Sequence, residues 1–391
     1  MRGYRADRAF DGERVVHGGA LVLVEDGRIA GVEPGDAAVG CPVTHLPGTT
    51  LLPGLIDTHV HLCADSRPFA LDRIPEMSAD ELDAVVRKSL RDQLMVGVTA
   101  VRDLGDHHFA VVDRHLGGDG PTVVAAGPPI TSAGGHCWSM GGEVDGDDEA
   151  RRAVRERAER GAQVIKVMAS GGVMTVTTDV LVPQFSDDRL RLVVDEAHAL
   201  GLPVVAHAHP VAAIEQCLDA GVDGIEHCTC IGPTGISTPP GLAERIAASG
   251  VVVGPTLGHV PGMEPPPQVQ AVMKRTGMTL EARLAQVGEL HRAGVPMIGG
   301  ADSGIGPGKP HGILPHAVAH MVGIGMSCAE ALASVTGAAA KACGLGDRTG
   351  RLRAGLDADL LVVAGDPLTD IAALQQVRLV VSRGVEVDLN G

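Results

Sequence analysis

Two histidines separated by one residue end the apolar segment LIDTHVHL at residues 55–62. Because side chains alternate between the two faces of a β-strand, His59 and His61 are expected to point to the same side. Neutral imidazole is a common protein ligand of zinc and similar divalent metals. The pair therefore predicts two ligands of one metal ion, although a single pair of this kind can also end a strand by chance.

Similar side chains end other apolar runs along the chain. The segment PVVAHAH places His207 and His209 on one face of a predicted strand. The segment GIEH ends in His227, and MIGGAD ends in Asp302. Imidazole nitrogens and carboxylate oxygens are both ligands of a zinc-like metal. These segments therefore predict a shared site in a fold that brings the strand ends together.

Lys166 lies inside the apolar segment VIKVM. Burying an ammonium group without a partner is costly, so an unmodified lysine at this position should be paired or deprotonated. The alternative is a lysine that extends from the strand end to solvent.

The composition excludes several classes of partner. A formal net charge of −16 argues against binding a nucleic-acid backbone, and only 2% of the 391 residues are aromatic, which leaves few platforms for stacked bases. The N-terminal residues lack an apolar signal core, and no run of about 18 apolar residues suggests a membrane span. The 8 cysteines do not resemble a disulfide framework. We expect a cytoplasmic protein with reduced thiols that binds neither nucleic acid nor membrane.

Both ends of the chain carry strand signals. The predicted strands lie at 20–24, 28–32, 358–363 and 377–381. The first two are separated by Glu-Asp-Gly, a strong hairpin signal. Each end is too small for an independent sheet. We therefore expect residues 1–52 and 350–391 to pair and form one small β-domain.

Between these ends, strand and helix signals alternate over residues 53–349. After the segment at 55–62, short apolar or β-branched runs lie at 98–101, 123–126, 164–168, 204–206, 224–226, 251–253 and 297–300. Amphipathic segments between them include 80–95, 147–160, 187–200 and 280–292. About eight strand–helix units predict an α/β fold, a (β/α)8 TIM barrel, whose catalytic groups lie at the C-terminal ends of the strands.

The motifs LPGLIDTHVH, IKVMASGG, AHAH, IEH and GAD occur in this order, with GRLRAGLDADL near the C-terminus. The ordered set resembles the amidohydrolase superfamily, which are metal-dependent hydrolases on a (β/α)8 barrel. Within it, the chain resembles the imidazolonepropionase-related group that contains Xaa-Pro and Xaa-Arg dipeptidases. The resemblance covers nearly the whole chain, and it implies that the β-domain formed by both termini is a β-sandwich.

The resemblance also implies a binuclear metal site, usually of zinc. The implied ligands of the more buried ion are His59, His61 and Asp302, and those of the second ion are His207 and His227. Lys166 would be carboxylated on its amine by carbon dioxide and would bridge both ions. A carbamate anion held by two cations replaces the isolated ammonium, which resolves the cost of burying this lysine.

Two cations that share one water lower its pKa and supply hydroxide near neutral pH, and a metal also polarises the substrate carbonyl. Asp302 would take the proton of the hydroxide and pass it to the leaving nitrogen. The expected activity is hydrolysis of the amide C–N bond of a small molecule, either a dipeptide or an N-acyl amino acid. Such relatives commonly form homo-oligomers, which is the prior expectation for this chain.

Two further histidines are candidate substrate contacts. His136 ends the segment SAGGH after the third predicted strand, where dipeptidase-like relatives have a histidine that binds substrate or stabilises the oxyanion. His209 shares a face with His207, and many relatives have tyrosine at its position. A contact with the substrate and a solvent-facing side chain both remain open for His209.

Three other functions remain open from the sequence. A cyclic amide is one alternative substrate, as for imidazolonepropionase, although Lys166 favours the dipeptidase-like enzymes because mononuclear imidazolonepropionases typically use no bridging carbamate. A deaminase of the adenosine type has a glutamate three residues after the fifth-strand histidine, where this chain has Pro210. A non-catalytic metal-binding barrel would usually have lost ligands, whereas all six candidates are present here.

Overall fold

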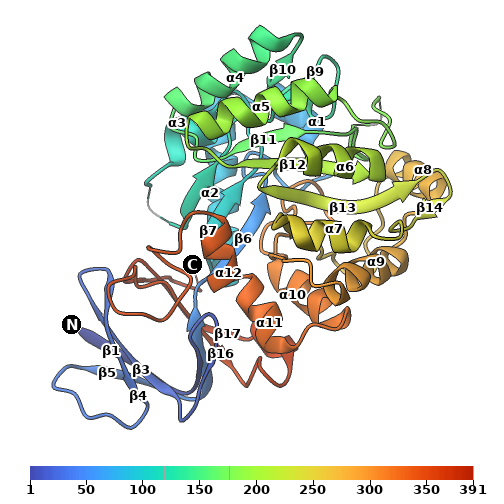
Figure 1. Cartoon of the computed structure of the whole chain (residues 1–391). Coiled ribbons are helices and arrows are strands. Elements are labelled where there is room, and N and C mark those ends of the chain that lie inside the picture. The colour runs from blue at the N-terminus through green and yellow to red at the C-terminus, as the bar shows by residue number, and fades with distance from the viewer. Residues whose placement is uncertain (119, 176, 391) are drawn as a thin grey trace.

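Strands from the two ends of the chain form one sheet at one end of the molecule (Figure 1). The computed structural model describes residues 1–118, 120–175 and 177–390. Within them, this eight-stranded sheet has the order β18–β17–β16–β5–β1–β3–β4, with β2 paired to β1. Its strands are β1 (Arg2–Phe10), β2 (Val15–Val16), β3 (Ala20–Glu25), β4 (Arg28–Pro34), β5 (Val43–Pro53), β16 (Leu360–Ala364), β17 (Val377–Ser382) and β18 (Val385–Glu386).

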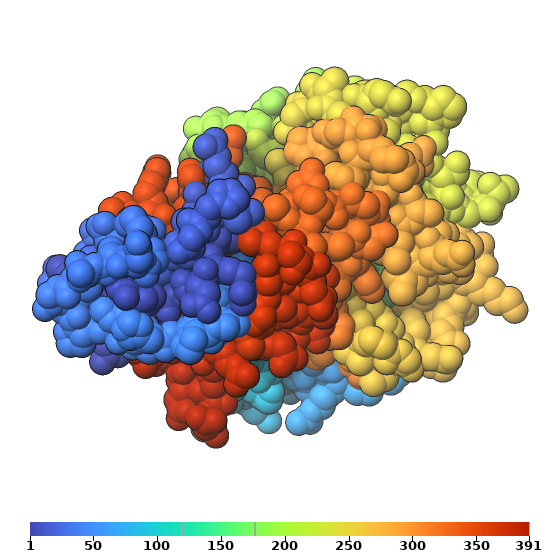
Figure 2. All heavy atoms as spheres, turned by 90° about the horizontal axis from the view of Figure 1, so that it is seen from below, coloured from blue at the N-terminus to red at the C-terminus, as the bar shows by residue number. Residues whose placement is uncertain are grey.

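The strand pairing confirms the predicted hairpin and joins a strand from each end of the chain. β3 and β4 pair antiparallel, and the turn residues Asp26 and Gly27 have φ angles of 50° and 77°, as a two-residue hairpin turn requires. β5 pairs antiparallel with β16, so that Leu52 lies opposite Leu361. A space-filling view accordingly shows the N-terminal and C-terminal segments side by side (Figure 2). A sandwich arrangement of this sheet stays a prediction.

Parallel strands form the middle of the chain. One sheet contains β6–β7–β8, and a second contains β11–β12–β13, with β15 paired parallel and β14 paired antiparallel to β13. Isolated parallel bridges join Ile130 to Val167, Val253 to Met297 and Val60 to Ser303. The strands are β6 (Leu55–Val60), β7 (Val98–Asp103), β8 (Thr122–Ala125), β11 (Ile165–Met168), β12 (Val204–Pro210), β13 (Gly224–Gly232), β14 (Gly235–Ile236) and β15 (Val252–Gly254), besides the short pair β9 (Thr131–Ser132) and β10 (Glu143–Val144).

Helices alternate with these strands and pack outside them (Figure 1). They are α1 (Ala70–Arg73), α2 (Ala79–Met95), α3 (Ala110–His115), α4 (Asp147–Glu159), α5 (Asp187–Ala199), α6 (Val211–Ala220), α7 (Leu242–Ser249), α8 (Pro267–Thr276), α9 (Leu280–Arg292), α10 (Leu314–Gly323), α11 (Cys328–Ser334) and α12 (Gly337–Ala342). The four amphipathic segments predicted as helices correspond to α2, α4, α5 and α9. In the described ranges, no helix combines the length and the apolar character needed to cross a membrane.

Helix α2 shows how local sequence places a polar side chain near the strand ends. The helix begins at a capping box in which Ser78 and Glu81 satisfy each other's backbone N–H groups. Buried leucine and valine side chains recur at helical spacing along one face, at Leu82, Val86, Leu90 and Leu94. Gln93 is buried as well, and its Nε2 donates to the Ser303 hydroxyl oxygen 3.0 Å away. The helix therefore supports the residue that follows Asp302.

The last strand predicted for the barrel, at 297–300, is not formed as a regular strand. Met297 makes an isolated parallel bridge to β15, and the following backbone runs close to β6. A Cβ atom on Gly300 would lie 2.7 Å from the hydroxyl oxygen of Thr58 and 2.9 Å from the backbone nitrogen of His59. Glycine weakens a regular strand but permits this close approach. The approach brings Asp302 against His59 of β6 and His61, which follows β6.

A buried carboxyl group immediately before β16 leads to a pH-dependent prediction. Asp359 accepts hydrogen bonds from the Thr349 hydroxyl at 2.7 Å and the Arg383 N–H at 2.8 Å, but burial raises its pKa from 3.8 to about 6. A group with a raised native pKa contributes stability that is present below its unfolded pKa and is lost as pH rises through about 6. The loss above that pH is roughly 3 kcal/mol.

Asp359→Asn keeps an acceptor for Arg383 and offers an amide to the Thr349 oxygen, without the buried charge. We therefore expect the variant to exceed the wild type in free energy of unfolding by about 2–3 kcal/mol at pH 8 and to approach it near pH 4. Urea unfolding at both pH values measures the difference. A gap that does not shrink toward pH 4 would show that the charge of Asp359 is not its source.

Candidate metal centre

The first group of candidate ligands contains His59, His61 and Asp302. The Oδ1 atom of Asp302 lies 3.5 Å from His59 Nε2 and 3.3 Å from His61 Nε2. All three side chains are buried, and their ligand atoms lie within 4.8 Å of one another. Donor atoms that share one zinc ion at about 2.1 Å are themselves separated by roughly 3–4 Å. The group therefore has the chemistry and nearly the spacing of a metal site.

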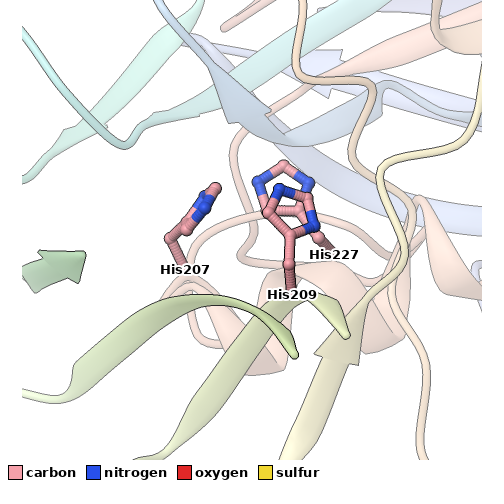
Figure 3. A group of neighbouring side chains, drawn as sticks. All are labelled: His207, His209 and His227. Atoms are coloured by element: carbon pink, nitrogen blue, oxygen red, sulfur yellow. The ribbon is translucent and has the colours of Figure 1, made fainter. Parts of the chain in front are cut away.

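The second group contains His207 and His209 of β12 and His227 of β13. The ring centroid of His207 lies 4.5 Å from that of each of the other two, and those two lie 4.8 Å apart. Figure 3 shows the three rings gathered on one side of the neighbouring strands. His209 is only 4% exposed, so the solvent-facing alternative for this residue is wrong. The fold brings it among the candidate ligands instead.

Lys166 of β11 shares a cavity with both groups. The groups are adjacent, since the ring centroids of His59 and His227 lie 5.4 Å apart. The Nζ atom of Lys166 is buried and, within the described ranges, has no hydrogen-bond partner. Burial lowers its pKa to about 8, so an appreciable fraction of the amine is uncharged near neutral pH. A buried polar atom without a partner, set among ligands, fits a site that a bound group completes.

Most of the candidate ligands, with His61 as the exception, are held in the protonation states that metals require. Burial, and after it the charge of neighbouring imidazoles, lowers the pKa values of His207 and His227 far below the ordinary histidine value. Burial lowers the pKa of His59 to about 4. Burial acts to lower the pKa of His61, but the hydrogen bond and charge of Asp302, together with the charge of Asp103, raise it above its ordinary value. Burial alone would raise the pKa of Asp302, yet the adjacent histidines hold it well below its ordinary range.

Buried charges orient His59. Its Nδ1 lies 2.7 Å from Glu226 Oε2, and Glu226 Oε1 accepts a hydrogen bond from Arg102 at 2.9 Å. Arg102 also donates to the Thr58 carbonyl oxygen at 2.8 Å. Because Nδ1 is engaged by the carboxylate, Nε2 is the nitrogen left to face Asp302.

Two candidate ligands lie on a strained backbone. His227 and Asp302 have φ angles of 67° and 56°, the left-handed region that residues other than glycine rarely adopt. Such a conformation costs about 1–3 kcal/mol and persists only where surrounding contacts enforce it. Arg283 donates to the carbonyl oxygen of His227. The backbone N–H of Ala301, the residue before Asp302, donates to the carboxylate of Asp57 at 2.9 Å. These contacts aim both side chains at the site.

The sequence over residues 50–387 matches the Amidohydrolase family. The chain belongs to the amidohydrolase family. This amidohydrolase is therefore a hydrolase that acts on C–N bonds of small molecules, in a family that generally uses metal ions. The histidine and aspartate groups described above are its candidate metal ligands.

Several named or structurally solved relatives align with most of the length of this amidohydrolase. Ochratoxinase of Aspergillus niger is 28% identical over 371 residues, which cover 84% of this chain and 73% of the relative. The structure of a Xaa-Pro dipeptidase with methionine bound in its active site is 25% identical, with a TM-score of 0.86 over 99% of both chains. That of a prolidase complexed with N-methylphosphonate-L-proline is 29% identical, with a TM-score of 0.84 over 99% of both chains. These similarities confirm the α/β fold of the TIM-barrel type.

The candidate ligands of the amidohydrolase line a cavity of about 400 Å³, and His136 lies on the same wall. The His136 ring centroid is 4.5 Å from that of His207, and its Nδ1 is hydrogen-bonded to the Thr175 hydroxyl at 2.8 Å. A Cβ atom on Gly172 would lie 2.3 Å from His136 Nε2, so glycine is needed where this loop meets the ring. The structure thus brings His136 to the ligands, and its role stays a prediction.

The sequence did not single out two cations that also line this cavity, Arg283 and Lys309. Arg283 lies within the amphipathic helix α9, where a buried arginine has no local signature. Lys309 lies in the glycine-rich and proline-rich segment SGIGPGKPHG that follows Asp302. A lysine in such a loop is ordinarily solvated, so only the folded arrangement reveals its position.

Glu226→Gln tests whether the buried ion pair of Glu226 and Arg102 contributes more to stability than an exposed ion pair does. The variant leaves Arg102 buried without a carboxylate, so we expect the free energy of unfolding to fall by about 3–5 kcal/mol and metal affinity to fall by roughly 10- to 100-fold. Urea unfolding and metal titration measure both effects. Glu196→Gln is the matched control: it pairs with Arg151 and Arg155, which are 46% and 57% exposed, and should cost less than about 1 kcal/mol. Equal losses in both variants would contradict the prediction.

Proposed function

We propose that this protein is a binuclear, metal-dependent amidohydrolase that cleaves the amide C–N bond of a dipeptide or an N-acyl amino acid. The observation that carries the proposal is the pair of adjacent ligand groups beside the buried, unpartnered Nζ of Lys166. When bound, two divalent ions, with zinc as the proposed metal, would lower the pKa of a shared water and polarise the substrate carbonyl.

The proposed ligands of one ion are His59, His61 and Asp302, and those of the other are His207 and His227, with Lys166 between them. The uncharged Lys166 amine is the form that reacts with carbon dioxide. In that reaction an N–C bond forms, one proton leaves the nitrogen, and an anionic carbamate results. Its two oxygens would serve as ligands on both sides, which removes the cost of an isolated buried ammonium.

The remaining polar side chains have proposed roles in proton transfer and substrate binding. Asp302 lies beside two imidazoles, and its carboxylate is proposed to accept a proton and deliver it to the leaving nitrogen. His136 and His209 are proposed to contact the substrate. The Nδ1 of His209 is 3.0 Å from the Thr229 hydroxyl, which leaves its second ring nitrogen for this contact.

The finer organisation of the chain is part of the proposal. We propose that residues 53–349 form a closed (β/α)8 barrel and that residues 1–52 and 350–391 form the β-sandwich. The isolated parallel bridges of Ile130 to β11, of Met297 to β15 and of Ser303 to β6 support closure. A homo-oligomeric assembly and a cytoplasmic location complete the proposal. The names of the solved relatives, a Xaa-Pro dipeptidase and a prolidase, support a peptide-like substrate.

The test is a mass-spectrometric screen of the zinc-loaded protein against mixed dipeptides and N-acyl amino acids. We expect cleavage of a narrow set, about two metal ions per chain, and loss of cleavage after the metal is removed by a chelator. The same protein reloaded with zinc is the control and should recover its activity. If the loaded protein cleaves no linear amide, or if the stripped protein cleaves as fast, the proposal is wrong.

A further inference from the structure

We propose that Lys309 binds the free carboxylate of the substrate and that the apolar cavity beside it holds a large uncharged acyl group. The substrate class is then N-acylated amino acids with bulky apolar acyl groups, and free dipeptides are poor substrates. This inference rests on the proposed amide hydrolysis, and it adds the residue and the cavity wall that select among amides.

Lys309 lies on the cavity wall with hydrogen bonds that leave part of its ammonium group available. Its Nζ donates to the carbonyl oxygens of Thr256 at 2.7 Å and Ala301 at 2.8 Å. An ammonium group has three N–H donors, so one remains for a ligand in the cavity. Asp302 and Asp57 act on this charge electrostatically, but no carboxylate in the described part of the chain forms an ion pair with it. A partly buried ammonium in this state favours an incoming anion.

The position of Lys309 matches the place where the carboxylate of such a substrate would lie. One of its acceptors, Ala301, immediately precedes Asp302. The other, Thr256, has a hydroxyl group 2.8 Å from His227 Nδ1. Lys309 therefore lies next to both ligand groups. In an N-acyl amino acid, the α-carbon alone separates the carboxylate from the scissile nitrogen, so the carboxylate receptor must lie close to the groups that act on the amide.

Arg283 lines the cavity as well, but both terminal nitrogens of its guanidinium group already donate to the protein. The guanidinium group donates to the carbonyl oxygens of His227 and Pro255 and to the side chain of Gln286. These contacts hold the strained backbone at His227. Arg283 is thus a positioning residue, and Lys309 is the better receptor for an anion.

Much of the cavity wall is apolar. Large apolar side chains come from α1 and its preceding residue and from the segment around α8, namely Phe69, Leu71, Met263, Val269, Met273 and Met278. Phe69 and Met263 are 45% and 40% exposed, so the apolar wall continues to the molecular surface. Burying one methylene group contributes about 0.8 kcal/mol. Such a wall favours a long or bulky uncharged chain.

The same wall disfavours the free α-ammonium group of a dipeptide. The carboxylates that line the cavity are Asp302, a candidate metal ligand, and Glu264, which is exposed and accepts a hydrogen bond from Gln270 at 3.3 Å. Burying an ammonium without a carboxylate partner is costly. An acylated nitrogen carries no charge and avoids this cost, so the acylated substrate is preferred.

The test compares matched substrates of the metal-loaded protein. The set contains N-octanoyl and N-acetyl amino acids, the leucyl dipeptides of the same amino acids, and the C-terminal carboxamide of the best substrate. We expect kcat/KM to fall roughly 10- to 100-fold when the carboxylate becomes a carboxamide. We expect a fall of roughly 100-fold or more when octanoyl is replaced by acetyl or leucyl.

Variants then assign the preference to one residue. Lys309→Met should remove the preference for the acid over the carboxamide, mainly through KM, and Lys309→Arg should keep most of it. Lys274→Met removes an exposed lysine of α8 and is the matched control. Its ratio of kcat/KM for the acid to kcat/KM for the carboxamide should equal that of the wild type. If Lys309→Met fails to fold, the wild-type ratio and the Lys309→Arg variant still decide the question.

Equal rates on the acid and its carboxamide, or an unchanged ratio in folded Lys309→Met, would overturn the role of Lys309 while amide hydrolysis stands. Faster cleavage of leucyl dipeptides than of N-octanoyl amino acids would overturn the apolar acyl site. If protein with confirmed metal content hydrolyses none of these amides, the proposed function fails, and the present inference fails with it.

Discussion

Asp302→Asn is expected to lower kcat by roughly 10²- to 10⁴-fold, the range for loss of a positioned acid–base group. Asparagine has nearly the shape of aspartate, and its oxygen can still face His59 and His61, which lie 3.5 and 3.3 Å from Asp302 Oδ1. It cannot accept a proton at neutral pH. The loss should therefore appear in turnover, and the metal content should fall less than the turnover does.

The measurement is kcat on the best substrate together with the metal content of the same preparation. Asp188→Asn makes the same chemical change at an exposed position of α5 and should retain wild-type turnover. If Asp302→Asn binds metal normally and keeps its turnover, proton transfer belongs to another residue.

Lys166→Met should have opposite effects on activity and on the stability of the metal-free protein. Without the bridging group we expect activity to fall by more than about 100-fold, because loss of even a supporting residue costs up to that factor. In the metal-free protein, however, the variant replaces a buried Nζ without a described partner by an apolar side chain of similar length. We expect the free energy of unfolding to rise by about 1–3 kcal/mol.

Urea unfolding of chelator-treated protein measures the stability, and elemental analysis of zinc-loaded protein measures the metal content. Lys341→Met, at an exposed position of α12, should change neither by a measurable amount. Full activity with two tightly bound metals in Lys166→Met would show that the lysine does not bridge. A metal-free variant less stable than the wild type would show that Lys166 contributes to the fold in a way that its contacts do not explain.

The loss of activity and the gain in metal-free stability expected for Lys166→Met would share one cause. The site concentrates a buried amine, imidazoles with low pKa values and two backbone positions in the left-handed region, His227 and Asp302. Each of these features lowers the stability of the metal-free fold. A ligand that binds only the native state offsets such costs in proportion to the logarithm of its concentration over its dissociation constant. Metal removal should therefore lower the unfolding temperature of the wild type more than that of Lys166→Met.

Much of this protein follows from local sequence patterns. Helical spacing of apolar residues predicted the segments that became α2, α4, α5 and α9, because helix formation depends on residues three and four apart. Strand alternation predicted that His59 and His61 share a face, and the Asp-Gly turn predicted the hairpin of β3 and β4. These relations extend over a few residues, so a sequence contains them directly.

Other features depend on which distant segments meet. Glu226 holds His59 across 167 residues of sequence, and Lys309 reaches the cavity from a loop with no helix or strand pattern. The segment before Asp302 forms no regular strand, because Gly300 approaches β6 and Gly299 approaches Val335 too closely for side chains. By itself, the sequence identified the candidate ligands and, except for Asp302, the strands that carry them or end beside them. The tertiary structure alone decided that His209 is buried beside those ligands and which buried charges orient them, because these contacts arise from the packing of distant strands and loops rather than from neighbours along the chain.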